Sequence, residues 1–191
     1  MLDDWLMEAP LLTERLLLRP ISPADKAAVL RYVGHELIAA TTLNIPHPYP
    51  PEAFEQFLAA TAEARAAGLA HLFVLIRRAD DELVGQMGLH IEPRHRRAEL
   101  GYWIGVPHWG QGYATEAARR LVDWGFGALG LNRIYATHFA ENPASGRVMQ
   151  KAGMRHEGVL RQHVFRFDRP RDLVCYGILR EEWSAAREGE P

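Results

Sequence analysis

The residues from Gly105 to Ala118 read GVPHWGQGYATEAA and place three glycines just before a helical pattern. Gly110 and Gly112 lie on either side of Gln111. Glycine permits a positive φ and leaves no Cβ between the backbone and a ligand. The first N–H groups of a helix lack internal partners, and the helix dipole adds positive potential there. The stretch therefore predicts an anion site suited to phosphate.

Two common nucleotide motifs fit this turn poorly. A P-loop has the pattern G-x-x-x-x-G-K-[ST], and no lysine follows Gly110 or Gly112. A Rossmann turn has a third glycine where this chain has Thr115, and the strand before the turn belongs to a run of short strands instead of opening a βαβ unit. A nucleotide-binding domain is therefore only a weak alternative.

The surrounding pattern predicts one mixed sheet flanked by helices. Three apolar runs separated by polar turns indicate an antiparallel meander, which strand–helix alternation then follows. No linker divides the chain, so we expect a single domain over 1–191, with its core at about 11–183 and a polar tail at 184–191. Strands are expected at 14–20, 71–78, 82–92, 97–106, 132–139, 154–167 and 172–183, helices at 22–34, 51–68, 113–130 and 142–153, and a proline-rich loop at 41–50.

Composition excludes several classes of partner. The net charge of −2 gives no electrostatic case for nucleic acid or an anionic membrane. Cys175 is the only cysteine, which rules out an intramolecular disulfide and fits a reducing compartment. The acidic start lacks the basic region of a signal peptide, and no apolar run could span a membrane. We therefore expect a cytoplasmic protein, and no metal site, because the nine histidines lack ligand spacing.

The segment WGQGYATEA resembles the pyrophosphate-binding motif of the GNAT acyltransferases, written [QR]-x-x-G-x-[GA]. Trp109 departs from the first motif position, whereas Gly112 and Ala114 match the others. Further segments resemble, in order, the RimJ/RimL-like branch of ribosomal-protein N-acetyltransferases: TERLLLRP, AELGYWIG, ENPASGRVMQKAGM, EGVLR and RDLVCYGILREEW. The resemblance implies an α/β GNAT fold, a mostly antiparallel twisted sheet of about seven strands with about four helices, splayed between the fourth and fifth strands.

The resemblance implies that the chain binds acetyl-coenzyme A. The pantetheine arm is expected to pair with backbone near Ile104 and Val106, and Gly105 fits a β-bulge there. Asn142 is expected to cap its helix and to contact this arm. The expected cofactor-binding residues are Ile104, Gly105, Val106, Trp109, Gly110, Gln111, Gly112, Tyr113, Ala114, Thr115, Asn142, Ser145, Arg147 and Lys151.

Two residues are the candidates for catalysis. By resemblance, Glu99 draws the amine proton through water, and Ser145 protonates the departing thiolate. Both have plainer interpretations, because Glu99 could be a solvent-facing strand residue and Ser145 could only support the helix start. The ribosomal-protein enzymes carry a further glutamate on the sixth strand where this chain has Val164, next to His163. This departure weakens the case for ribosomal-protein specificity.

The implied reaction is direct attack of a primary amine on the thioester through a tetrahedral intermediate. The favoured acceptor is a protein or peptide N-terminus. The alternatives are a small amine, such as a polyamine, an amino acid or an amine antibiotic, and a non-catalytic acyl-coenzyme A sensor. We expect acceptor contacts from Asn44, His47 and Tyr49 in the proline-rich loop and from His163. By analogy with relatives, the protein could form a homodimer.

Overall fold

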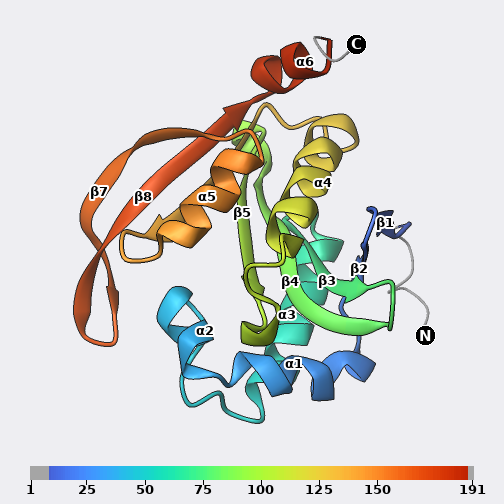
Figure 1. Cartoon of the computed structure of the whole chain (residues 1–191), viewed down its shortest axis with the longest axis vertical. Coiled ribbons are helices and arrows are strands. Elements are labelled where there is room, and N and C mark those ends of the chain that lie inside the picture. The colour runs from blue at the N-terminus through green and yellow to red at the C-terminus, as the bar shows by residue number, and fades with distance from the viewer. Residues whose placement is uncertain (1–8, 189–191) are drawn as a thin grey trace.

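The structure is a computed structural model and describes residues 9–188. Residues 1–8, which carry most of the acidic start behind the signal-peptide prediction, lie outside this range, and so does the end of the expected tail. The described residues form one eight-stranded sheet with helices against both faces (Figure 1). The single domain over 1–191 that we expect from the sequence stays a prediction.

The strand order across the sheet is β1-β2-β3-β4-β5-β6-β8-β7. All neighbouring strands are antiparallel except β5 and β6, which run parallel. The strands are β1 (Leu11–Leu12), β2 (Leu16–Pro20), β3 (Ala70–Arg77), β4 (Glu82–Glu92), β5 (Arg97–Ile104), β6 (Arg133–Phe139), β7 (Arg155–Arg166) and β8 (Arg169–Leu179). The expected meander corresponds to β3, β4 and β5.

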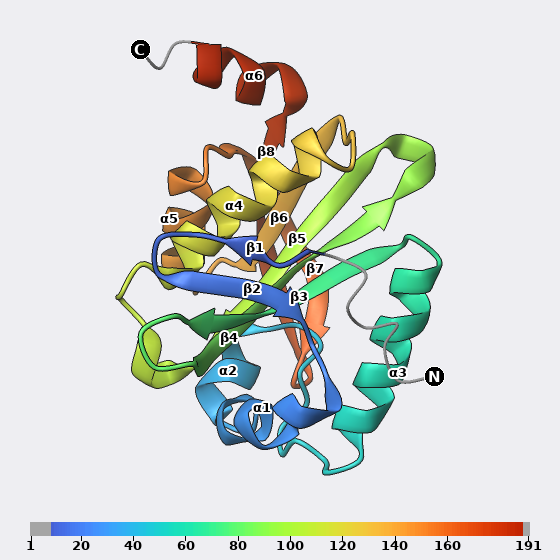
Figure 2. The same ribbon diagram turned by 90° about the vertical axis from the view of Figure 1, so that its right-hand side faces the viewer.

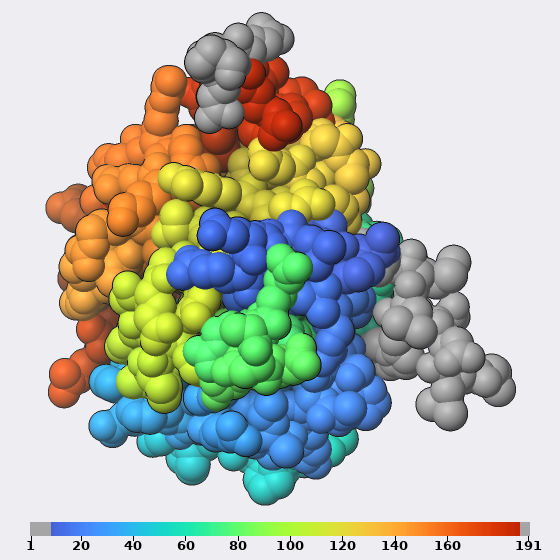
Figure 3. All heavy atoms as spheres, turned by 45° about the vertical axis from the view of Figure 1, so that its right-hand side comes forward, coloured from blue at the N-terminus to red at the C-terminus, as the bar shows by residue number. Residues whose placement is uncertain are grey.

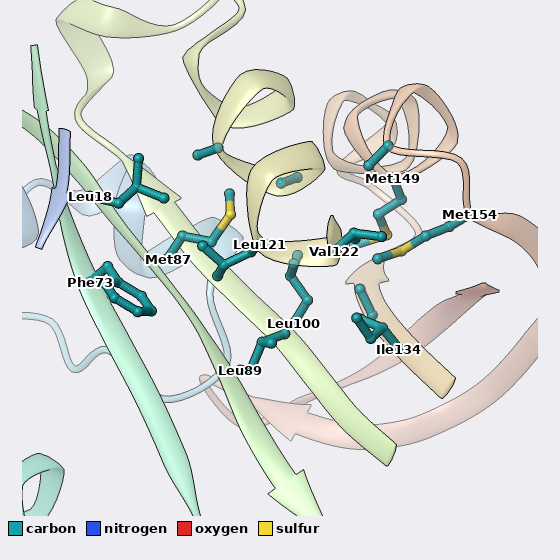
Figure 4. Packing of buried hydrophobic residues seen from close by; sticks show 14 of the residues in the cluster. Leu18, Phe73, Met87, Leu89, Leu100, Leu121, Val122, Ile134, Met149 and Met154 are labelled. Atoms are coloured by element: carbon teal, nitrogen blue, oxygen red, sulfur yellow. The ribbon is translucent and has the colours of Figure 1, made fainter. Parts of the chain in front are cut away.

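The helices divide between the two faces, as Figure 2 shows. The helices are α1 (Lys26–Val33), α2 (Glu36–Thr41), α3 (Ala53–Ala66), α4 (Tyr113–Gly127), α5 (Pro143–Lys151) and α6 (Arg180–Glu188). One core packs α4 and α5 against the sheet, with Leu121 and Met149 among the buried side chains (Figure 4). The second core joins α1, α2 and α3 to the opposite face, where Trp103 of β5 is buried. Because side chains alternate along a strand, β5 contributes to both cores.

The expected splay is present between β5 and β6. The two strands pair only from Arg97 to Glu99 of β5, opposite Arg133 to Tyr135 of β6. Beyond that point they separate. The loss of pairing exposes strand backbone in the middle of the sheet, which is where a ligand could take the place of a neighbouring strand.

The β-bulge expected at Gly105 is absent. The register between β4 and β5 is continuous from Arg97 to Ile104, and the N–H of Gly105 extends the ladder by donating to the carbonyl of Val84 at 2.9 Å. Glycine is needed here for another reason. A Cβ on Gly105 would lie 2.9 Å from the ring of Tyr32, so its absence lets α1 pack closely against the end of β5.

Two helices were not predicted from the sequence. His35 caps α2 by accepting the N–H of Leu37 at its Nδ1, at 3.2 Å, and α2 buries Ile38 in the second core. The chain after β8 forms α6 where we expected the end of a strand and a tail. There, Nε1 of Trp183 donates to Asp123 of α4 at 2.6 Å. The burial of Ile38 and the contact of Trp183 with α4 stabilise these two helices, because each is short.

Two other differences concern the N-terminal third. The helix expected at 22–34 begins as a 3₁₀ turn, Pro23–Asp25, before α1. The Asp25 carboxylate accepts hydrogen bonds from the N–H of Ser22 at 2.8 Å and from Arg19, and these contacts hold the tight turn. The short strand β1 pairs with Leu17 and Leu18, which raises the number of strands from about seven to eight.

Candidate functional site

The glycine turn has the backbone geometry expected of an anion site. Gly110 and Gly112 adopt φ values of +74° and +86°, in the region that favours glycine. Gly112 is the N-cap of α4, so the first N–H groups of the helix face the turn. A Cβ on Gly110 would meet no heavy atom within 4 Å, which means that open space lies beside this backbone. The turn can therefore receive a phosphate group without displacing protein atoms.

A cavity of about 420 Å³ runs from this turn to α5, a size suited to a small-molecule ligand. Its walls come from α2, β5, the turn with the start of α4, and α5. The lining residues are Ile38, Thr41, Thr42, Tyr102, Trp103, Ile104, His108, Trp109, Gly110, Gly112, Tyr113, Ala114, Thr115, Asn142, Ala144, Ser145, Arg147, Val148 and Lys151. Of the expected cofactor-binding residues, Gly105, Val106 and Gln111 do not line it. The other expected residues all lie on its wall.

Trp109, which departs from the family motif, ties the turn to the end of β5. Its Nε1 donates to the carbonyl oxygen of Ile104 at 2.6 Å. This hydrogen bond thereby stabilises the backbone between Ile104 and Trp109, which leads into the glycine turn. The same bond occupies one lone pair of the Ile104 carbonyl, which was an expected partner for pantetheine.

Ser145 lies on the cavity wall at the start of α5. The side chain of Asn142 caps this helix by accepting the N–H of Ser145 at 3.4 Å, as the sequence predicted. The hydroxyl of Ser145 is 2.7 Å from Oη of Tyr102 on β5. Burial raises the pKa of Tyr102 to about 12, so its phenol is neutral at physiological pH. No motif marks Tyr102 in the sequence, but it alternates with Leu100 and Ile104 along β5 and so lies on the α4 side of the sheet.

Glu99 does not line this cavity. It lies on the opposite face of β5 from Tyr102, because the two residues are three apart on an alternating strand. Its Oε1 accepts a hydrogen bond from Oγ1 of Thr137 on β6 at 3.4 Å, beside the point where the strands separate. The assignment of Glu99 as the base therefore stays a prediction.

His108, which lines the cavity, belongs to a buried chain of hydrogen bonds with Tyr32 and Glu82. The hydroxyl of Tyr32 donates to Oε1 of Glu82 at 2.7 Å, so it can accept the Nε2–H of His108, which is 3.2 Å away. Burial lowers the pKa of His108, although the nearby Glu82 acts in the opposite direction. The histidine is therefore neutral near pH 7. It lies inside the glycine-rich segment, but its burial follows from its contact with α1, which sequence spacing could not show.

The predicted acceptor contacts do not meet at the cavity. Asn44, His47 and His163 are exposed and do not line it. Tyr49 packs instead against the second core. The structure therefore does not place these four residues at this cavity, and their contact with the acceptor stays a prediction. From the loop expected at 41–50, only Thr41 and Thr42 line the cavity.

Two further predictions concern metals and membranes. Within residues 9–188, no group of three or more His, Cys, Asp and Glu side chains is arranged to hold a metal ion. None of the helices in the same range has the length and apolar character needed to cross a membrane.

Comparisons with known proteins agree with this geometry. The family model described as an acetyltransferase (GNAT) domain matches residues 15–155. The uncharacterized N-acetyltransferase YoaA of Bacillus subtilis (strain 168) is 36% identical over 178 residues, covering 88% of this chain and 95% of that protein. A ribosomal-protein-serine acetyltransferase of Escherichia coli (strain K12) is 33% identical over 110 residues, covering 57% of this chain and 60% of that protein. A solved GNAT-family acetyltransferase from Bacillus anthracis superposes with a TM-score of 0.81 at 29% identity, covering 91% of this chain and 99% of that chain.

Proposed function

We propose that this chain, which belongs to the GNAT acetyltransferase family and transfers acetyl groups from acetyl-coenzyme A, acts on the N-terminal α-amine of a protein or peptide. The observation that carries this proposal is the absence of carboxylates from the cavity. No Asp or Glu is among the residues that line it in the described part of the chain. A site for a polyamine, which is a multiple cation, would need such groups to offset the charge.

The ordinary pKa of the acceptor supports the same choice. An α-amine has a pKa of about 8, whereas a lysine amine has one of about 10.4. A substantial fraction of an α-amine is already neutral near pH 7 and can attack without a strong base. A cavity lined by hydroxyls, a neutral His108 and aromatic rings suits this acceptor. The Escherichia coli relative, named for acetylation of a ribosomal-protein serine residue, also has a protein acceptor.

The chain's residues have distinct proposed roles toward acetyl-coenzyme A, whose thioester supplies the acetyl group. The N–H groups at Gly110 and Gly112 would hold the pyrophosphate, with Arg147 and Lys151 one helical turn apart on the rim for further phosphates. The hydroxyl of Ser145 would donate a hydrogen bond to the departing sulfur. We propose that Glu99 acts only through water, across the gap between β5 and β6.

The proposal is tested by thiol release from acetyl-coenzyme A with three matched acceptors. These are a lysine-free peptide with a free N-terminus, the same peptide with a blocked N-terminus and one added lysine, and spermidine. We expect the first to be acetylated with a kcat/KM at least about tenfold above the others. Its rate should rise with pH and level off near the α-amine pKa of about 8.

Other outcomes would point elsewhere. Preference for spermidine would contradict the peptide acceptor and favour the small-amine alternative. Tight acetyl-coenzyme A binding without release for any amine would favour a sensor. The cytoplasmic location and the homodimer stay predictions.

A further inference from the structure

We propose that Tyr102 is a positioning residue, which holds the hydroxyl of Ser145 toward the sulfur of the acyl donor. The inference rests on the proposed function, because it assumes that the sulfur is bound beside Ser145. It adds a group on β5 to a reaction for which the sequence had indicated only Glu99 and Ser145.

The surroundings of Oη of Tyr102 are compatible with a hydrogen bond that it donates to Ser145. This oxygen is 2.7 Å from Oγ of Ser145 and 3.5 Å from the backbone carbonyl oxygen of the same residue. A carbonyl oxygen can only accept, so a tyrosine hydrogen aimed between the two oxygens satisfies both. The contact is compatible with either hydroxyl as the donor, and our proposal takes Tyr102 as the donor and Oγ of Ser145 as the acceptor. The hydrogen of the serine hydroxyl is left free to point into the cavity.

The elements on both sides of this bond are rigid. Tyr102 lies within the continuous ladder of β5 with β4 and packs against the core under α4. Ser145 is in the first turn of α5, and its N–H is bound by the side chain of Asn142. The Ser145 hydroxyl lies between a packed strand and a capped helix, so it loses little conformational freedom when a ligand binds. The arrangement therefore favours one orientation of the serine hydroxyl.

Tyr102 positions Ser145 but does not itself supply a proton. A thiol has an ordinary pKa of about 8.5, and a buried phenol in this setting holds its proton far more strongly. In the reaction, the N–C bond to the acetyl carbon forms and the C–S bond breaks. The amine nitrogen loses a proton, which balances the proton that the thiolate gains. Ser145 donates a hydrogen bond to the sulfur, and Tyr102 strengthens that bond by donating to Ser145.

The inference is tested on bound coenzyme A, without any acceptor. The thiol of bound coenzyme A is titrated by the ultraviolet absorbance of its thiolate, against a reference with acetyl-coenzyme A, which has no free thiol. A hydroxyl that donates to the thiolate lowers the thiol pKa. We expect S145A to raise the thiol pKa by about one unit and Y102F to raise it by about half a unit. Because Tyr102 acts through Ser145, the S145A/Y102F double variant should match S145A alone.

Tyr176 provides the matched control. It lies under the same helix, and its hydroxyl accepts a hydrogen bond from Nε2 of Gln150 at 3.3 Å, but it does not line the cavity. Y176F should leave the thiol pKa unchanged. Circular dichroism and coenzyme A affinity would establish that each variant is folded.

The outcomes separate this inference from the proposed function. An unchanged thiol pKa in Y102F would overturn the role of Tyr102. The same role would be overturned if Y102F shifted the thiol pKa equally in the wild type and in S145A. The expected shifts together with no acetylation of any amine would leave Tyr102 in place and overturn the acceptor proposal. A folded wild type that does not bind coenzyme A would overturn both.

Discussion

Arg15 and Glu116 form an ion pair across the start of α4, with Nε of Arg15 donating to Oε2 of Glu116 at 2.7 Å. Nη1 of the same guanidinium donates to the carbonyl oxygen of Gln111 at 2.9 Å, and the cation lies over the ring of Tyr113. Figure 3 shows the N-terminal segment (blue) beside the turn around residue 110 (yellow-green). Arg15 thus offsets a carboxylate that would repel an anion at the turn, and it also holds the turn in place.

We therefore expect Arg15→Gln to weaken acetyl-coenzyme A binding by about tenfold, because the variant leaves the charge of Glu116 uncompensated beside the phosphates. Titration calorimetry measures the change. Arg120→Gln is the control for net charge, since Arg120 is on the same helix but donates to the carbonyl of Leu12. Equal losses in the two variants would show that only overall charge matters.

Gly112→Asp should weaken acetyl-coenzyme A binding by about a hundredfold or more. A side chain is strained at a φ of +86°, and the new carboxylate would lie where we place the pyrophosphate. Calorimetry of the folded variant provides the measurement. Gly127→Asp adds the same charge at the exposed far end of α4, about 20 Å away, and should change the affinity less than twofold. Undiminished binding in Gly112→Asp would refute the position of the phosphate site.

Gly146→Ala should lower the free energy of unfolding by about 1–3 kcal/mol. A Cβ at this position would lie 2.7 Å from Nε2 of His138 and 3.3 Å from Oη of Tyr176, both beneath α5. Urea unfolding measures the loss. Ala144→Gly on the same helix serves as a comparison, since it tests helix propensity alone and should cost about 1 kcal/mol or less. A Gly146→Ala variant as stable as the wild type would mean that α5 can shift away from β6.

The stability of the protein should fall as the pH drops below about 6.5, partly because of His108. The unfolded chain takes up a proton at this position near pH 6.5, whereas burial lowers the pKa of His108 in the folded protein. The contribution of His108 to stability is thus fully present above the pKa of the unfolded chain. It is lost as the pH falls toward the lower pKa of the folded protein. Between pH 7.5 and 5.5, His108→Asn should lose less stability than the wild type in urea unfolding. An identical pH dependence would contradict this account.

Glu99→Gln should lower kcat on a peptide N-terminus by less than about tenfold, because an α-amine needs little help to lose its proton. Steady-state rates at saturating acetyl-coenzyme A measure the effect. Glu92→Gln removes a carboxylate that pairs with Arg97 at the end of the adjacent strand, and it should leave kcat unchanged. A loss of a hundredfold or more in Glu99→Gln alone would make Glu99 an obligatory base.

The local patterns predicted most of what builds the site. Glycine spacing predicted the turn, and the helix start after Asn142 was predicted from Asn-Pro at its first positions. These features depend on backbone preferences within a few residues, so one sequence is enough to recognise them. The splay between β5 and β6, by contrast, came from the family resemblance.

The features that could not be predicted from the sequence are contacts between distant parts of the chain. The bond between Tyr102 and Ser145 joins residues 43 apart, and that between His108 and Tyr32 joins residues 76 apart. Neither pair has a spacing that periodicity could detect. The short helix α2 was missed for a related reason, because a six-residue helix depends on tertiary support, here the burial of Ile38 in the second core.

The cavity wall is built from three separate stretches of the chain. Residues 102–115 and 142–151 build the side that would hold the acyl donor, whereas Ile38, Thr41 and Thr42 are the contribution of the first fifty residues. Descendants of one ancestral enzyme could acquire new amine preferences by exchanging α2 and the residues behind it. Grafting that short segment between relatives offers the same route in the laboratory.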